Sequence, residues 1–154
     1  MKSLQESLLD DEEDLIDNTE VKEEDLVKKY IENHYLIYGS DKIWVKPSRK
    51  QVEVKSIIPN PDVETLELPF GYEWDLSYLG TVQIYACNNL KNLKGCPKYV
   101  TNVHISNCNN LTSLEGAPKE VEEEFEVSHC DKLKNLKGGP EYVGKRYDVQ
   151  YNKG

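Results

Sequence analysis

A phrase that occurs three times in the second half of the chain constrains the fold more than any other sequence feature. It has the form Leu-x-x-Leu-x-Gly-x-Pro-x-x-Val and spans residues 90–100, 111–121 and 133–143. The copies start 21 and 22 residues apart. Periods of about 20–29 residues are typical of solenoids, in which each repeat forms one coil and shares its core only with its neighbours.

Each copy leads into a segment of alternating apolar and polar residues, a pattern that predicts a half-buried strand. These segments are residues 103–105, 125–127 and 147–149, and residues 82–84 mark an earlier turn of the same kind. The glycine of the phrase allows a tight bend, and the proline suits a loop because it needs no ladder N–H. We therefore expect stacked coils whose strands form a narrow parallel sheet.

The order aliphatic-x-aliphatic-x-x-Cys-x-x-Leu-x-x-Leu resembles the cysteine-containing type of leucine-rich repeat. Residues 111–121 are similar to short leucine-rich-like proteins of tailed bacteriophages and Bacteroidota, as is the acidic N-terminal leader. The resemblance covers residues 63–154. It implies an α/β repeat fold, a short leucine-rich-repeat-like solenoid preceded by an N-terminal helix and a short β cap. It indicates an architecture rather than an activity.

Three regions are expected along the chain: an acidic mobile leader (residues 1–18), a helix with short strands that caps the solenoid (19–62), and the solenoid (63–154). Asn18 or Thr19 suits the N-cap of a helix over residues 20–34. Short strands are predicted over residues 35–38, 42–45 and 51–54, separated by turn residues. The aromatic-rich residues 66–76 are expected to form an irregular coil before the regular repeats, and we interpret them as core and cap rather than as a platform for stacking a ligand.

The net charge of −9 comes mainly from the start of the chain. Residues 1–28 hold 11 acids and 3 bases, whereas the remaining residues hold 17 acids and 16 bases. No basic footprint for a phosphate backbone is present, so nucleic-acid binding is disfavoured. No apolar stretch predicts a membrane span or a signal peptide. The sequence favours a cytoplasm, where thiols stay reduced. The resemblance implies the cytoplasm of a bacterial host, with a virion as the other location.

The leader has two interpretations. Its composition is typical of a solvated tail. Leu4, Leu8 and Leu15 would share one helical face, however, and this stripe also fits a linear motif that folds onto a partner.

Cys87, Cys108 and Cys130 fall at equivalent positions of successive coils. A zinc site favours close Cys-x-x-Cys pairs, which are missing, and side chains that point the same way from adjacent strands are poorly placed for disulfides. We expect structural thiols that are buried and bonded to backbone, as the resemblance also implies, with no metal and no cofactor. Cys96 is expected to be a loop thiol without an assigned role, and the glutamates of residues 120–126 to be a solvated acidic edge rather than a calcium site.

The outward strand positions predict a polar strip, and these residues form the candidate protein-binding face: Gln83, Tyr85, His104, Ser106, Glu126, Ser128, Asp148 and Gln150. A remote alternative is a hydrolase that uses Ser106 or Ser128 with His104. A catalytic triad needs a buried, oriented acid and an oxyanion hole, which a flat strip does not supply by itself. The leading hypothesis is a non-enzymatic protein-interaction module. The resemblance alone suggests the alternative of a structural or packaged component of a phage particle.

The charges around the last predicted strand, Lys145, Arg146, Asp148 and Lys153, discourage pairing between strand edges. We therefore expect a monomer unless the chain is assembled in a particle. Val143 and Val149 are expected to be buried, and residues 152–154 to be mobile.

Overall fold

The structure is a computed structural model that describes residues 21–37 and 43–151, without the side chains of residues 77–79. The acidic leader with Leu4, Leu8 and Leu15 lies outside the described residues, and so do residues 152–154. The predictions for those two segments stay predictions.

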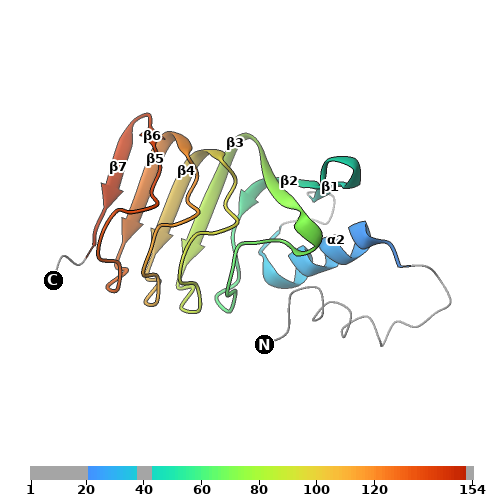
Figure 1. The fold of residues 1–154 in the computed structure, drawn as a ribbon, viewed down its shortest axis with the longest axis horizontal. Coiled ribbons are helices and arrows are strands. Elements are labelled where there is room, and N and C mark those ends of the chain that lie inside the picture. The colour runs from blue at the N-terminus through green and yellow to red at the C-terminus, as the bar shows by residue number, and fades with distance from the viewer. Residues whose placement is uncertain (1–20, 38–42, 152–154) are drawn as a thin grey trace.

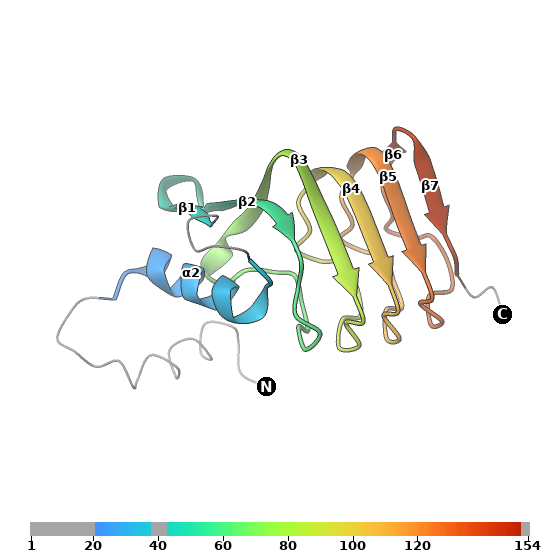
Figure 2. The same cartoon turned by 180° about the vertical axis from the view of Figure 1, so that it is seen from behind.

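The described residues form a β-solenoid of about four turns with one helix at its N-terminal end (Figures 1 and 2). The helix is α2 (Glu23–His34), and the short 3-10 turns are η3 (Pro47–Arg49) and η4 (Pro69–Gly71). The strands are β1 (Trp44–Lys46), β2 (Gln51–Ile57), β3 (Glu73–Tyr85), β4 (Tyr99–Ser106), β5 (Glu120–Ser128), β6 (Tyr142–Val143) and β7 (Arg146–Val149). None of the described helices is long and apolar enough to cross a membrane.

The seven strands form one mixed sheet, because the cap strand β1 joins the parallel sheet that was predicted for the coils. Strands β2 to β7 pair in parallel, as stacked coils require, but β1 pairs antiparallel with β2. The cause is the short η3 turn between β1 and β2. A connection this short can join only antiparallel strands, because a parallel pair needs a crossover of a dozen or more residues.

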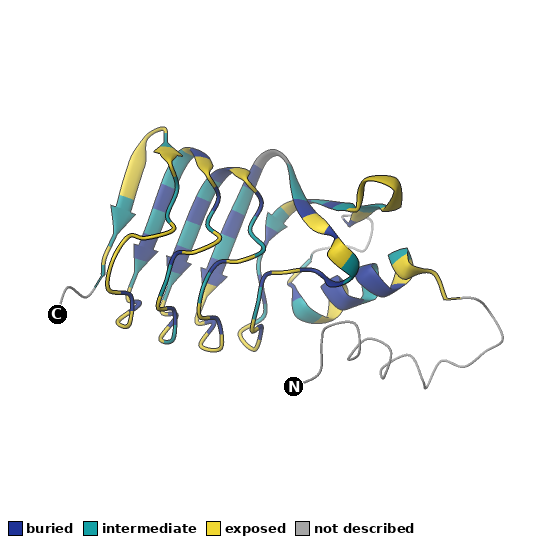
Figure 3. Ribbon diagram, viewed as in Figure 1, coloured by how far each residue is buried: buried dark blue, intermediate teal, exposed yellow. Residues whose placement is uncertain are grey.

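The core is a stack of equivalent apolar side chains inside the coils. Val82, Val103 and Phe125 are in register on β3, β4 and β5, and all three are fully buried. The leucines of the repeated phrase close the interior from the other side, and Leu93 and Leu114 are also fully buried. Buried and half-buried residues alternate along these strands in Figure 3. The predicted alternation is therefore the packing pattern of the solenoid.

The glycine of the repeated phrase is required for two reasons. Gly95, Gly116 and Gly138 have φ values of 103°, 90° and 82°, a region that L side chains rarely adopt. A Cβ on Gly116 would also lie 2.4 Å from Cα of Lys94 in the preceding coil. Each glycine therefore lets one coil rest directly on the backbone of the coil before it.

A first coil precedes those that the repeated phrase predicts. A Cβ on Gly95 would meet the backbone of Leu66 and Glu67, just as one on Gly116 would meet Leu93 and Lys94. The same hydrogen-bonded turn also recurs in four coils. In each, a polar side chain accepts a hydrogen bond from the backbone N–H two residues later, and the acceptors and their N···O distances are Thr65 at 3.2 Å, Asn92 at 3.0 Å, Ser113 at 2.9 Å and Asn135 at 3.0 Å. Val63-x-x-Leu66 is thus a divergent form of the Leu-x-x-Leu phrase, in the coil that follows β2.

The N-terminal end of the core is covered by α2, from which Val27, Tyr30 and Ile31 are buried. The helix begins at Glu23, and its N-cap is Lys22 with no side-chain capping bond, whereas the sequence predicted a start at residue 20. The predicted strand over residues 35–38 is wrong for the described part. Tyr35 forms a single bridge with Pro59. Its ring packs in the core against Trp74, with centroids 4.9 Å apart.

At the other end, Val143 and Val149 are half-buried, so the expectation that they would be buried is corrected. Tyr147 is in register with the fully buried Phe125, yet 41% of Tyr147 is exposed. The reason is geometrical: within the described residues, no further coil covers this side of the last one.

Candidate functional site

The sheet strip, defined as the eight outward residues predicted above, is a continuous surface feature. In the register of the strands, Gln83 lies opposite His104, His104 lies opposite Glu126, and Glu126 lies opposite Asp148. A second row places Tyr85 beside Ser106 and Ser106 beside Ser128. Gln150 follows β7, and its backbone N–H donates to the carbonyl of Val127. Adjacent strands lie about 4.8 Å apart, so each row places one polar side chain per strand spacing.

One part of the strip is a charged network. Nδ1 of His104 lies 3.0 Å from Oε2 of Glu126, and Arg146 reaches Oε1 of Glu126 at 3.3 Å and Asp148 at 2.9 Å. These side chains are about one-third or more exposed. Exposed pairs contribute only about 0–1 kcal/mol each, so the network orders the surface more than it stabilises the fold.

The other part of the strip is uncharged. Tyr85 is 47% exposed and stands at the edge of the second row, where Ser106 and Ser128 follow it. Exposed tyrosines are enriched at protein-binding surfaces, and the small serines beside Tyr85 leave its ring accessible.

The hydrolase alternative finds no support in the hydrogen bonds of the strip. His104 bonds to Glu126, but no bond joins His104 to Ser106 or Ser128 within the described chain. Glu126 also pairs with Arg146 and is about one-third exposed, unlike the buried, oriented acid of a triad. The hydrogen bonds of these residues are those of a surface ion-pair network.

The cysteine column lies behind the strip, at the corner where each strand ends. Cys87, Cys108 and Cys130 are free and buried, and each thiol donates to the carbonyl two residues before it, at 3.6, 3.5 and 3.4 Å. Hydrogen bonding with Cys108 lowers the pKa of Cys87, whereas hydrogen bonding with Cys108 and burial raise the pKa of Cys130. Among the described residues, no group of three or more His, Cys, Asp or Glu side chains could hold a metal ion.

The glutamates of residues 120–126 lie along β5 in different environments. Glu123 pairs with Lys145 at 3.2 Å, and Glu126 belongs to the network described above. Glu120 and Glu122 are exposed. Their carboxylates therefore do not converge on one point.

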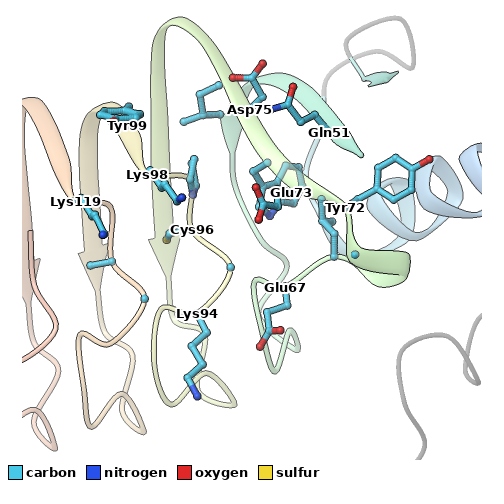
Figure 4. Close-up of a pocket in the computed structure, with 18 residues that line it drawn as sticks. Gln51, Glu67, Tyr72, Glu73, Asp75, Lys94, Cys96, Lys98, Tyr99 and Lys119 are labelled. Atoms are coloured by element: carbon cyan, nitrogen blue, oxygen red, sulfur yellow. The ribbon is translucent and has the colours of Figure 1, made fainter. Parts of the chain in front are cut away.

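A second feature, which sequence reasoning missed, is a groove of about 810 Å³ on the loop side of the solenoid (Figure 4). It lies between the start of β3 and the loops of the next two coils. We call it the loop-side groove. Its apolar and small lining includes Leu68, Tyr72, Trp74, Leu76, Cys96, Pro97, Tyr99 and Ala117. Tyr99 is 66% exposed at its rim.

The groove exists because the first coil is longer than the others. Leu66 and Leu93 are 27 residues apart, whereas Leu93 and Leu114 are 21 apart. The extra residues form η4 and the first part of β3, which pairs with β2 before β3 turns to pair with β4. The unequal spacing of the leucines is the sequence signal for the groove. It can be used only after Val63-x-x-Leu66 has been recognised as the counterpart of Leu-x-x-Leu.

The two walls of the groove carry opposite charges. Glu67, Glu73 and Asp75 line one wall, and Lys94, Lys98 and Lys119 line the other. Asp75 is 3.7 Å from Lys46, and Lys94 is 3.7 Å from Glu115. Lys98 and Lys119 have no ion-pair partner within the described part of the chain.

The comparisons with known proteins give no further information about either feature. No family model, curated protein or solved structure matches the chain.

Proposed function

We propose that the protein is a non-enzymatic interaction module and that the sheet strip binds an extended segment of a protein partner. The observation that carries this proposal is the register of the strip. The strands hold its outward side chains in two straight rows on a rigid sheet, with an exposed aromatic residue in one row and a charged network in the other. Preorganised surfaces bind with a smaller loss of side-chain entropy.

The charges of the strip indicate the kind of segment that fits it. Glu126, Asp148 and the neighbouring Glu124 face one guanidinium, that of Arg146. This part of the strip therefore favours a basic segment, while Tyr85 favours an apolar side chain beside it. Complementary charge at such a surface contributes mainly to specificity and to the rate of association.

We further infer that the coils are leucine-rich repeats of the cysteine-containing type. Buried thiols after β3, β4 and β5 support this assignment, as do five buried leucines of the repeated phrase: Leu90, Leu93, Leu111, Leu114 and Leu133. So does the asparagine ladder at the corner, where Asn110 donates to the carbonyl of Asn88 at 2.6 Å. Repeats that keep their interior and vary their exterior are suited to recognition.

Affinity purification with matched variants tests the proposal. We expect Tyr85→Ala combined with Glu126→Lys to lose a partner that the unchanged protein retains. The control combines Tyr142→Ala with Glu115→Lys, which removes an exposed tyrosine and reverses an exposed glutamate outside the strip. A partner lost equally from both variants, or from neither, would contradict binding at the strip.

A further inference from the structure

The loop-side groove has a chemistry that the sheet strip lacks. It combines an apolar lining with two exposed ammonium groups, those of Lys98 and Lys119, that have no ion-pair partner among the described residues. Such a groove fits a segment with apolar side chains and several carboxylates. The chain itself contains one: residues 1–18 hold 7 acids, 1 base and the stripe Leu4, Leu8 and Leu15.

The start of α2 is tethered beside the groove. Glu23, the first residue of the helix, forms an ion pair with Lys50. Nζ of Lys50 lies 4.8 Å from the ring centroid of Tyr72, and Tyr72 lines the groove at the end nearest α2 (Figure 4). The described chain therefore starts close to one end of the groove.

The lengths are compatible with docking. Asp14 is eight residues before Lys22, a separation that an extended chain spans at about 26 Å. From the first long coil to the coil that carries Lys119, the solenoid advances by only about 10 Å, two strand spacings. This length of chain exceeds the spacing between the coils that line the groove, so the acids of residues 10–14 need no change in the solenoid to lie along it.

We propose that the acidic leader docks in the loop-side groove of its own chain, with its carboxylates on Lys98 and Lys119 and its leucines on the apolar lining. On the opposite wall Asp75 is paired with Lys46, whereas Glu67 and Glu73 have no ion-pair partner among the described residues, so the carboxylates of the leader would lie along the lysine wall. Tethering supplies an effective concentration of about 1 mM, so a dissociation constant of about 0.1 mM keeps roughly nine leaders in ten docked. A partner segment with the same composition would have to displace the leader.

Carbodiimide cross-linking of the full-length chain tests the placement directly, because it joins carboxylates to lysines that touch them. A mixture of heavy-isotope and ordinary chains separates links within one chain from links between chains. We expect intrachain links from residues 10–14 to Lys98 or Lys119 to exceed links to Lys134 and Lys137 by about tenfold. The latter pair is exposed and lies outside the groove lining. Equal yields at the four lysines would overturn the proposal, and so would links found only between chains.

Cleavage of the leader by a glutamate-specific protease gives a second readout on the same full-length chain. Docking should slow cleavage, and Lys98→Glu with Lys119→Glu should speed it about tenfold, while Lys134→Glu with Lys137→Glu should leave it unchanged. Replacing Leu4, Leu8 and Leu15 by Ser keeps the charge of the leader and should also speed cleavage. Unchanged cleavage in both the groove variant and the leucine variant would show that the leader does not occupy the groove. Tyr85→Ala, which alters the sheet strip, should affect neither readout, so this inference and the proposed function can fail separately.

Discussion

At the scale of single residues, one buried side-chain polar group of the described chain has no hydrogen-bond partner. The hydroxyl of Tyr35 accepts and donates no hydrogen bond within the described residues, although the side chain is 2% exposed. Burial raises the pKa of this hydroxyl well above its usual value. A buried, unsatisfied hydroxyl costs about 1–3 kcal/mol relative to one that is paired or solvated. The packing of the Tyr35 ring against Trp74 therefore stabilises the fold, whereas its unpaired hydroxyl destabilises it.

Tyr35→Phe should therefore leave the free energy of unfolding unchanged or raise it by about 1 kcal/mol, because the ring packing is kept. Urea denaturation measures the change. Trp74→Phe is the control in the same contact, and it should destabilise the fold because it removes the 2.8 Å hydrogen bond from Nε1 to the carbonyl of Leu66. A loss of more than about 1 kcal/mol in Tyr35→Phe would show that the hydroxyl has a partner, such as a bound water.

Cys96 should make the free energy of unfolding depend on pH in the alkaline range. Burial raises the pKa of its thiol from 9.0 to about 12. Because the folded pKa lies above the unfolded one, the stabilisation is complete below pH 9 and is lost as the pH rises toward 12. The free energy of unfolding should fall by up to about 1.4 kcal/mol per pH unit from this group. Cys96→Ala should reduce the slope measured by urea denaturation under reducing conditions between pH 9 and 11. An identical slope in both proteins would contradict the raised pKa.

At the scale of one coil, the contact between a glycine and the preceding backbone sets how closely the coils stack. Gly116→Ala places a Cβ against the backbone of Lys94 and also strains a positive φ. Gly71→Ala strains a positive φ of 75° in open space, since no atom lies within 4 Å of its Cβ position. We expect losses of about 2–5 kcal/mol for Gly116→Ala and about 1–2 kcal/mol for Gly71→Ala by thermal or urea unfolding. Similar losses in the two variants would mean that stacking tolerates the extra atom.

The coils of the repeated phrase could be predicted because their signal is local and recurs. Leu111, Leu114 and Gly116 occupy the same places as their counterparts in the other copies, so one pattern identifies each coil. The first coil could not be predicted in this way, because Val63 replaces a leucine and no Gly-x-Pro follows at the usual distance. The paired rows of the sheet strip followed from the repeat. The loop-side groove did not, because it arises from a deviation from the repeat.

At the scale of the whole molecule, the two ends of the solenoid differ. The N-terminal end is covered by α2, with Val27 and Ile31 fully buried. The last described coil lacks a cover, so Val143 and Val149 are half-buried and Leu136 is 41% exposed. Stability in a solenoid is approximately a sum of coil terms and contacts between neighbouring coils. A coil with one neighbour therefore has fewer stabilising contacts than a coil with two.

Local opening should begin at the C-terminal end. Backbone amides of β7 are expected to exchange hydrogen fastest among the strands of the solenoid and those of β4 slowest, because β4 has a coil on each side.

Leu111→Ala and Leu133→Ala offer a matched comparison, since both leucines are fully buried at equivalent positions. Each substitution costs about 2–5 kcal/mol where it acts. Leu111→Ala should lower protection throughout the solenoid, whereas Leu133→Ala should lower it mainly in β6 and β7 and leave β2 to β4 nearly unchanged. Hydrogen exchange read by mass spectrometry or NMR measures this gradient at several protein concentrations. Protection of β7 equal to that of β4, increasing with concentration, would show that this end is covered by a second copy and would contradict an open last coil.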